Sequence, residues 1–309
     1  MTLKQLQYAV AIDNFRSFTK AAASCLVTQP TLTMQVQKLE DEIGIKLFDR
    51  GQKPLVPTPT GEHFILRARQ ITREMDQLKE FVSSDKESIS GSFSIGVIPT
   101  VAPYLLPLVL PDFIERYPDT HLVLEELQTA EIIRRLSAGT LDVGVLVTPL
   151  EERQIREIPL YNEPFLLYGN PKDSIMSHGL IVASELDSSR ALLLNEGHCF
   201  REQTLNICGQ STAPHKGFEY ASGSLEGLKS LVRRGLGYTL VPELSVNEEV
   251  ESDYLRRFDS PEPMREVSLA VHSGFSKEAL IEILRDSIQA VIPEAFQQPQ
   301  HYRRIRWRL

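Results

Sequence analysis

The chain has 309 residues, a formal net charge of −8 and three cysteines. This length allows two or three domains with substantial cores, and a small, odd number of cysteines excludes a disulfide-stapled scaffold. We expect a soluble protein in the reducing cytoplasm, with no membrane partner. The N-terminus lacks a charged region followed by an apolar run, and no apolar stretch is long enough for a bilayer.

The charges are unevenly distributed along the chain. Residues 1–73 carry ten Lys and Arg against six Asp and Glu, a net +4, which leaves −12 for the remainder. A basic head on an acidic chain suggests that the two parts have separate tasks. We expect residues 297–309 to be a solvated basic tail rather than a phosphate contact. Its charged residues, which surround Trp307, are Arg303, Arg304, Arg306 and Arg308.

Residues 1–58 predict an all-α winged helix-turn-helix. Apolar spacing predicts a helix over 3–12, and Ser17 and Thr28 are suited to cap a second and a third helix, the latter ending at Gly44. The outward face of the third helix carries short hydrogen-bonding side chains and one cation, which suit a DNA major groove, with an ordinary solvated face as the alternative. These candidate DNA contacts are Thr28, Gln29, Pro30, Thr31, Thr33, Gln35 and Lys38.

A wing is expected directly after the third helix. Residues 46–50 and 54–58 suggest two short strands around a Gly-Gln-Lys turn. Arg50 and Lys53 lie at or beside this turn, and we expect them to meet DNA phosphates.

A longer helix is expected to begin at Pro59, because Thr58 is a suitable cap and proline is favoured in the first turn. Its apolar residues alternate in spacings of four and three, a heptad seam that favours pairing with a second copy over packing within one domain. We place this dimerisation helix and a polar hinge at residues 59–90. The seam residues are Phe64, Ala68, Ile71, Met75, Leu78 and Val82.

Beyond residue 90 the pattern changes to alternating strands and helices. This order predicts βαβ units, and hence a parallel sheet with helices on both faces. Ligands bind beyond the carboxyl ends of strands in such sheets, and Thr100, Thr129 and the His198-Cys199 pair each follow an expected strand end. The expected strands are 93–98, 122–127, 141–147, 190–195, 218–221 and 267–272, and the expected helices are 103–117, 130–138, 224–234 and 276–292.

Cys199 and Cys208 are the most distinctive pair in the sequence. His198 and Arg201 flank Cys199, and nearby positive charge favours the reactive thiolate. If this segment is helical, the two residues are about 13.5 Å apart along the axis and on opposite faces. A disulfide needs Cα atoms within roughly 7 Å, so bridging would require local unfolding. The alternative is two unrelated buried cysteines.

The first 85 residues resemble the LysR-type transcriptional regulators. This resemblance implies that the partners are double-stranded promoter DNA and RNA polymerase, and that the protein acts at the nucleoid in the bacterial cytoplasm. The motifs that carry it are Phe18-Thr19-Lys20-Ala21-Ala22, Thr28-Gln29-Pro30-Thr31-Leu32-Thr33, Lys38-Leu39-Glu40, Gly44, Leu47-Phe48-Asp49-Arg50 and Thr58-Pro59-Thr60-Gly61.

Within this family, the remainder of the chain resembles the members that sense hydrogen peroxide. The resemblance implies a regulatory part at 91–296 built of two βαβ subdomains, as in type 2 periplasmic binding proteins. Subdomain I would comprise 91–162 and 267–296 and subdomain II 163–266, with the chain crossing near Tyr161 to Pro164 and near Arg265. The motifs are the Ile98 to Pro107 run, Gln128-Thr129 and Gly197-His198-Cys199-Phe200-Arg201, with Cys208 at the expected separation.

The resemblance also implies a redox switch with no cofactor and no metal. Cys199 would be the peroxidatic thiol and Cys208 the resolving thiol, joined by a disulfide in the oxidised form. Donors that orient peroxide and stabilise the leaving charge would be Thr100, Thr129, His198 and Arg201. The protein would be a homodimer through its linker helix and then a tetramer. It would activate oxidative-stress genes and be reset by a thiol reductant such as a glutaredoxin or thioredoxin.

Three other functions compete with this interpretation. A LysR-type regulator with a small-molecule effector in the cleft would keep its regulation after Cys199→Ser. A thiol peroxidase has no need of a helix-turn-helix, so we do not expect an enzyme. A solute-binding protein is disfavoured because no signal peptide is evident.

Overall fold

A computed structural model describes residues 1–52, 54–82, 89–208, 220, 222–298 and 301–307. The chain forms two compact units, one built mainly of residues 1–86 and the other of most of the remaining chain. In these described residues no helix is both long and apolar enough to cross a membrane.

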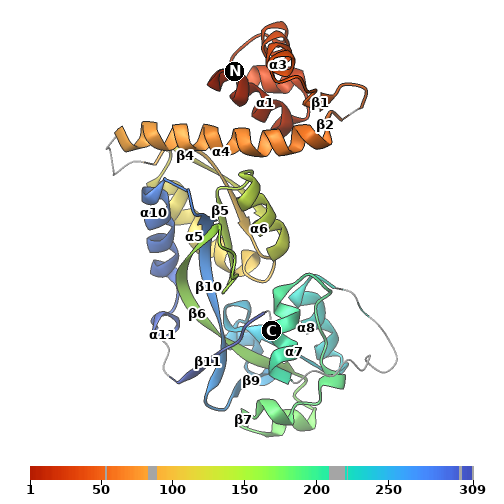
Figure 1. Cartoon of the computed structure of the whole chain (residues 1–309). Coiled ribbons are helices and arrows are strands. Elements are labelled where there is room, and N and C mark those ends of the chain that lie inside the picture. The colour runs from red at the N-terminus through yellow and green to blue at the C-terminus, as the bar shows by residue number, and fades with distance from the viewer. Residues whose placement is uncertain (53, 83–88, 209–219, 221, 299–300, 308–309) are drawn as a thin grey trace. The chain divides into compact units, whose positions relative to one another are not determined.

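The N-terminal unit consists of the expected helices and a two-stranded wing (Figure 1). The Ser17 hydroxyl accepts a hydrogen bond from the Lys20 amide, and the Thr28 hydroxyl accepts one from the Thr31 amide, which confirms both caps. Gly44 ends the third helix with a φ of 74°, a conformation that costs glycine little. The elements are α1 (Leu3–Phe15), α2 (Phe18–Ser24), α3 (Gln29–Ile43), β1 (Phe48–Asp49), β2 (Val56–Pro57) and α4 (Pro59–Val82).

Helix α4 presents two different faces. Ile65 and Ala68 are buried in the core of the N-terminal unit, together with residues of α1 and α3. Ile71 and Leu78 are 48% and 66% exposed. Part of the heptad seam therefore packs within the unit, and part forms an apolar surface that a second copy could cover. The pairing with a second copy stays a prediction.

The regulatory unit is a mixed α/β fold (Figure 1). Its strands are β3 (Gly91–Val97), β4 (Thr120–Glu126), β5 (Val143–Thr148), β6 (Ile155–Gly169), β7 (Leu180–Ile181), β8 (Tyr238–Pro242), β9 (Leu255–Phe258), β10 (Glu262–His272) and β11 (Tyr302–Arg304). Its helices are α5 (Ala102–Arg116), α6 (Thr129–Ala138), α7 (Cys199–Cys208), α8 (Leu225–Arg233), α9 (Glu248–Glu251), α10 (Glu278–Val291) and α11 (Glu294–Gln297).

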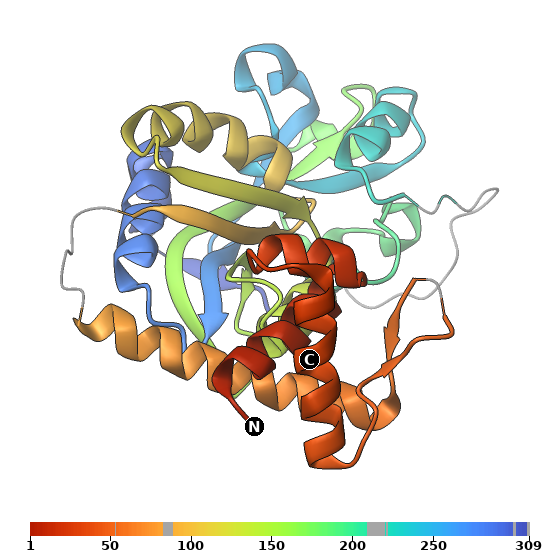
Figure 2. The ribbon, with the colours of Figure 1, turned by 90° about the horizontal axis from the view of Figure 1, so that it is seen from above.

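The sheet of the regulatory unit is parallel only in part. Among the described residues its main order is β4-β3-β5-β10-β6-β9-β7, with β8 pairing with β6 and β11 with β10. Strand β3 is parallel to β4 and β5, as the βαβ pattern predicts. Right-handed connections then place α5 and α6 on opposite faces (Figures 1 and 2). Strand β10 is antiparallel to both β5 and β6, so the prediction of a parallel sheet fails there.

Strands β6 and β10 connect the two ends of the regulatory unit. The first part of β6 pairs with β10 as far as Pro164 opposite Met264, and its last part, from Phe165, pairs with β8 and β9. These positions coincide with the two places, near Tyr161 to Pro164 and near Arg265, where the resemblance implies that the chain passes between the subdomains. The subdomain boundaries themselves stay a prediction.

One expected strand is not formed, and another lies almost wholly outside the described residues. Residues 190–195 form no strand, because Ala191 makes only an isolated bridge to Tyr238 before the chain turns toward α7. Residues 218–221 lie outside the described residues except for Tyr220, which is not in a strand.

Residues 302–307 are not the solvated tail that the basic composition suggested. Strand β11 pairs in parallel with the start of β10, with Tyr302 opposite Glu262 and Arg304 opposite Met264. Ile305 follows β11 and is buried in the core of the regulatory unit. The arginine-rich composition concealed this docking, because the backbone pairing and the partners of these side chains come from distant parts of the chain.

Candidate functional site

The two distinctive cysteines mark the ends of one helix. Helix α7 begins at Cys199 and ends at Cys208, which confirms that the segment between them is helical. Both are free thiols, and both are buried. Helix geometry therefore holds the two residues about 13.5 Å apart along the axis.

Groups around the Cys199 thiol shift its pKa in opposite directions. Burial raises its pKa above the ordinary value and is the largest influence. The Thr129 hydroxyl, the Arg265 guanidinium and the backbone amides of Cys199 and Phe200 lower the pKa in part. The thiolate is therefore disfavoured at rest, but groups that would stabilise it already surround the sulfur.

Arg265 supplies the positive charge at this site. Its guanidinium is 1% exposed and pairs with the equally buried Glu163 at 2.7 Å. It also donates to the Thr100 hydroxyl at 2.9 Å and to the Thr100 carbonyl at 3.0 Å. The guanidinium lies 5.6 Å from the ring centroid of Phe200, the residue that follows Cys199. Arg265 was expected only as a crossing point, and Glu163 was not among the expected site residues. No local signal distinguishes the two, because β6 and β10 carry other charged residues, such as Arg156 and Glu266.

The loop before α7 approaches the start of α6. Gly197 has a φ of 90°, and a Cβ built on it would lie 2.6 Å from Gln128 Oε1. Gln128 immediately precedes Thr129, whose buried hydroxyl has no nitrogen or oxygen partner among the described residues. The close approach thus brings Thr129 to the Cys199 thiol, as the strand-end argument predicted for these two residues.

His198 and Arg201 flank Cys199 in the sequence. His198 is buried, and this burial lowers its pKa, which favours the neutral imidazole. The Arg201 guanidinium donates to the Leu194 carbonyl at 3.0 Å. Their roles at Cys199 stay a prediction, and Arg265 is the cation that lowers the pKa of the thiol.

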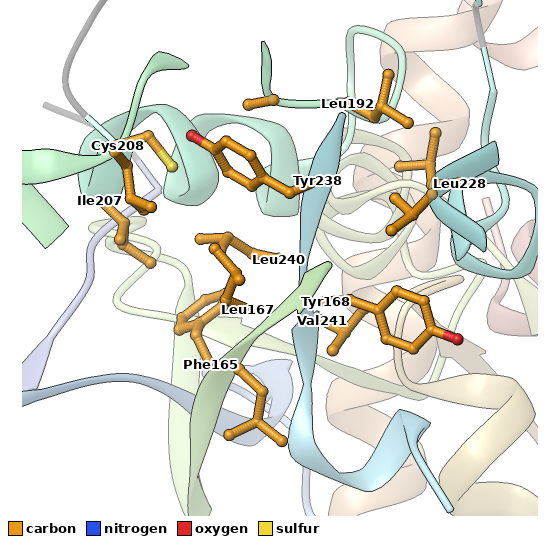
Figure 3. Close-up of a cluster of buried hydrophobic side chains, with 14 of the residues drawn as sticks. Phe165, Leu167, Tyr168, Leu192, Ile207, Cys208, Leu228, Tyr238, Leu240 and Val241 are labelled. Atoms are coloured by element: carbon orange, nitrogen blue, oxygen red, sulfur yellow. The ribbon is translucent and has the colours of Figure 1, made fainter. Parts of the chain in front are cut away.

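Cys208 occupies an apolar environment. It lies in a core cluster with Ile207, Leu240 and Phe165, and the Tyr238 hydroxyl points toward it (Figure 3). Burial raises the pKa of the Cys208 thiol to about 11. Cys208 is therefore a neutral thiol in this conformation.

The candidate DNA-binding face lies on α3. Thr28, Gln29, Pro30, Thr31 and Lys38 are exposed on the isolated unit. Thr33 and Gln35 are half-buried on the same helix. The sequence analysis omitted Met34 and Gln37, which are also exposed.

The wing residues were predicted to contact phosphates. Arg50 donates to the fully buried Glu40 at 3.2 Å and stacks on the Phe18 ring, so it holds the wing against α3. Its phosphate contact stays a prediction, and Lys53 lies outside the described residues.

Comparison with known proteins agrees with both units. The model of the bacterial regulatory helix-turn-helix protein, lysR family, matches residues 3–62, and that of the LysR substrate binding domain matches residues 86–293. The chain is 37% identical to a hydrogen peroxide-inducible genes activator of Pectobacterium carotovorum, over 94% of this chain and 96% of that protein.

Two further relatives match along nearly the whole chain. The DNA-binding transcriptional dual regulator OxyR of Escherichia coli is 36% identical, over 94% of this chain and 95% of that protein. The structure of a full-length OxyR variant from Pseudomonas aeruginosa matches with a TM-score of 0.83 and 32% identity, covering 94% of this chain and 99% of that one. The chain belongs to the LysR family of transcriptional regulators and closely resembles its OxyR members.

Proposed function

We propose that this protein is a DNA-binding transcriptional activator that senses hydrogen peroxide through Cys199 and a reversible disulfide with Cys208. The observation that carries the proposal is the single helix α7, which starts at a thiol facing Thr129 and Arg265 and ends at the second thiol. The relatives described above are named as a hydrogen peroxide-inducible genes activator and as OxyR, and this supports hydrogen peroxide as the signal. The regulated genes would serve defence against oxidative stress.

The first step oxidises Cys199. Its thiolate attacks one oxygen of hydrogen peroxide, the O–O bond breaks, and a sulfenic acid and hydroxide form. Burial raises the pKa of the thiol, so its proton must leave as peroxide enters. The Thr129 hydroxyl, the first amides of α7 and Arg265 would stabilise the developing negative charge.

Three further residues complete the proposed peroxide site. Thr100 would orient peroxide through the hydroxyl that already accepts from Arg265. His198, as a neutral imidazole, and Arg201 would contribute donors once the loop before α7 rearranges.

The second step joins the two cysteines. The Cys208 thiol attacks the sulfenic sulfur and water leaves, so two thiols and one peroxide become one disulfide and two waters. The Cα atoms must come within roughly 7 Å, which the intact helix forbids, so part of α7 must unwind. Unwinding removes Ile207 and Cys208 from the core and thereby couples oxidation to conformation.

The output of the switch would be a change in DNA binding. A homodimer through α4, assembled further into a tetramer, would read two half-sites with its α3 helices. Oxidation would reposition the paired N-terminal DNA-binding units and favour contact with RNA polymerase. In this proposal the chain comprises a DNA-binding domain at 1–58, a dimerisation helix and hinge at 59–90, a regulatory domain at 91–296 and a C-terminal segment at 297–309.

Resetting the switch would require a thiol reductant such as a glutaredoxin or thioredoxin. Each oxidation consumes the cysteine pair until it is reduced, so the protein would act as a switch and not as an enzyme. The protein would work at the nucleoid in the cytoplasm.

Stoichiometric oxidation tests the proposal. About one equivalent of hydrogen peroxide per subunit is added to reduced protein, the reaction is quenched within seconds by alkylation, and the thiols are mapped by peptide mass spectrometry. We expect a Cys199–Cys208 link that is lost in Cys199→Ser and retained in the matched control Cys25→Ser. In Cys208→Ser we expect a sulfenic acid and no intramolecular link. Full alkylation of both thiols in the unaltered protein would contradict the proposal and favour a small-molecule effector.

A further inference from the structure

The C-terminal residues bind directly to the redox helix. The Gln203 amide on α7 donates to the Ile305 carbonyl at 2.8 Å, and the Asn206 amide donates to the Arg306 carbonyl at 2.9 Å. We name residues 302–307 the strap. Gln203 and Asn206 are three positions apart on one face of α7, so both reach the strap only while this turn of helix is intact.

The strap is anchored on the other side to the central strand of the sheet. Strand β11 pairs with the start of β10, and the Ile305 amide donates to the Met264 carbonyl at 2.8 Å. Met264 directly precedes Arg265, the cation beside Cys199. The strap therefore links α7 to the strand that carries the charge at the proposed peroxide site.

Side chains of the strap make further contacts with the regulatory unit. Ile305 is buried in the same cluster as Ile207 and Cys208. Arg304 pairs with Glu266. The Trp307 indole donates to the Pro149 carbonyl at 3.0 Å. The strap is thus attached at several points, and it covers the part of α7 that must unwind.

We propose that the strap restrains the helical, reduced form of α7 and sets the rate of the disulfide step without affecting the peroxide step. The proposal rests on the proposed function, because only disulfide formation requires α7 to unwind. While α7 is helical, Gln203 and Asn206 hold the strap. Once Cys208 moves toward Cys199, both hydrogen bonds and the Ile305 contact are lost.

The first test removes the restraint in two ways. One variant ends at residue 300, and the other is Gln203→Met with Asn206→Ala, which keeps the strap but removes both donors. Each hydrogen bond contributes a factor of roughly two to ten, so we expect disulfide formation to be about tenfold faster in either variant. In the Cys208→Ser background, the rate of sulfenic acid formation at Cys199 should change less than about twofold.

Two controls separate restraint from general destabilisation. Arg303→Ala changes an exposed strap side chain and leaves the backbone acceptors in place. Leu228→Ala removes a buried side chain from α8 in the same core cluster, on the side away from Cys208 (Figure 3). Both controls should form the disulfide at the rate of the unaltered protein.

The second test needs no substitution. Trp307 is the only tryptophan of the chain, so its fluorescence reports on the strap. We expect emission to shift to longer wavelength when the disulfide forms, and no shift when Cys208→Ser is oxidised.

The outcomes distinguish the two proposals. If the unaltered protein forms no Cys199–Cys208 disulfide, the proposed function fails and the strap inference fails with it. If the disulfide forms at equal rates with and without the strap contacts, or if Trp307 emission does not change, the inference is wrong and the proposed function stands.

Discussion

Replacing Arg265 by methionine is expected to destabilise the regulatory unit by about 3–5 kcal/mol, the usual result of removing one partner from a buried ion pair. Arg265 and Glu163 are each 1% exposed and 2.7 Å apart, so water does not compensate the carboxylate that remains. Among the described residues, Glu163 would keep the hydrogen bond from the Leu244 amide at 2.9 Å. Thr100 would also lose the donor to its hydroxyl and its carbonyl.

Equilibrium urea unfolding of the full chain, followed by far-ultraviolet circular dichroism, measures this loss. The double variant Arg265→Met/Glu163→Gln removes the isolated charge and keeps an acceptor for the Leu244 amide. It should recover about 2 kcal/mol or more relative to Arg265→Met alone. The reasoning is refuted if Arg265→Met lies within about 1 kcal/mol of the unaltered protein, or if the double variant is no more stable than the single one.

The remaining predictions concern the thiol, the loop before it and the DNA-binding face. Thr129→Val should raise the pKa of Cys199 further, since the hydroxyl lowers it, and shift the pH profile of alkylation in Cys208→Ser to higher pH. A hydrogen bond to a charged group is worth about 1.5–3 kcal/mol, so alkylation at neutral pH should slow about tenfold or more, and an unshifted profile would exclude the contact. Gly197→Ala should cost about 1–3 kcal/mol in urea unfolding, because its φ is 90°, and a neutral result would contradict the strained geometry. Lys38→Ala should weaken binding to operator and non-operator DNA alike and reduce the salt slope by about one, and unchanged titrations would remove Lys38 from the interface.

Local sequence signals determined the elements of the N-terminal unit. Thr28, Gly44 and Pro59 act through hydrogen bonds and backbone conformations within a few residues, so the helix ends were readable from the chain. For the segment from Cys199 to Cys208 the sequence supported only a conditional statement, that a helix there would hold the two thiols too far apart for direct bridging, and the structure shows this helix. The βαβ order predicted the parallel part of the sheet for the same reason, because each unit is local in sequence.

Only the tertiary structure decided the electrostatics of the proposed site. Glu163 and Arg265 are 102 residues apart in the chain, and their pairing depends on the antiparallel register of β6 and β10. Burial lowers the pKa of His198 and raises that of Cys199, and burial depends on which distant segments cover a residue. The residues beside Cys199 in the sequence therefore did not reveal Arg265, the cation that lowers the pKa of the thiol.

The strap illustrates the same limit. Its composition, three arginines and a tryptophan, predicted a solvated tail, because charged side chains usually remain in water. Its docking depends on backbone groups, on Ile305 and on the Arg304 and Trp307 contacts, all of which form only after the chain has folded. Composition describes side chains, whereas long-range backbone pairing depends on the whole fold. The sequence therefore determined most of the helices and pointed to the candidate cysteine pair, and the tertiary structure decided what surrounds that pair.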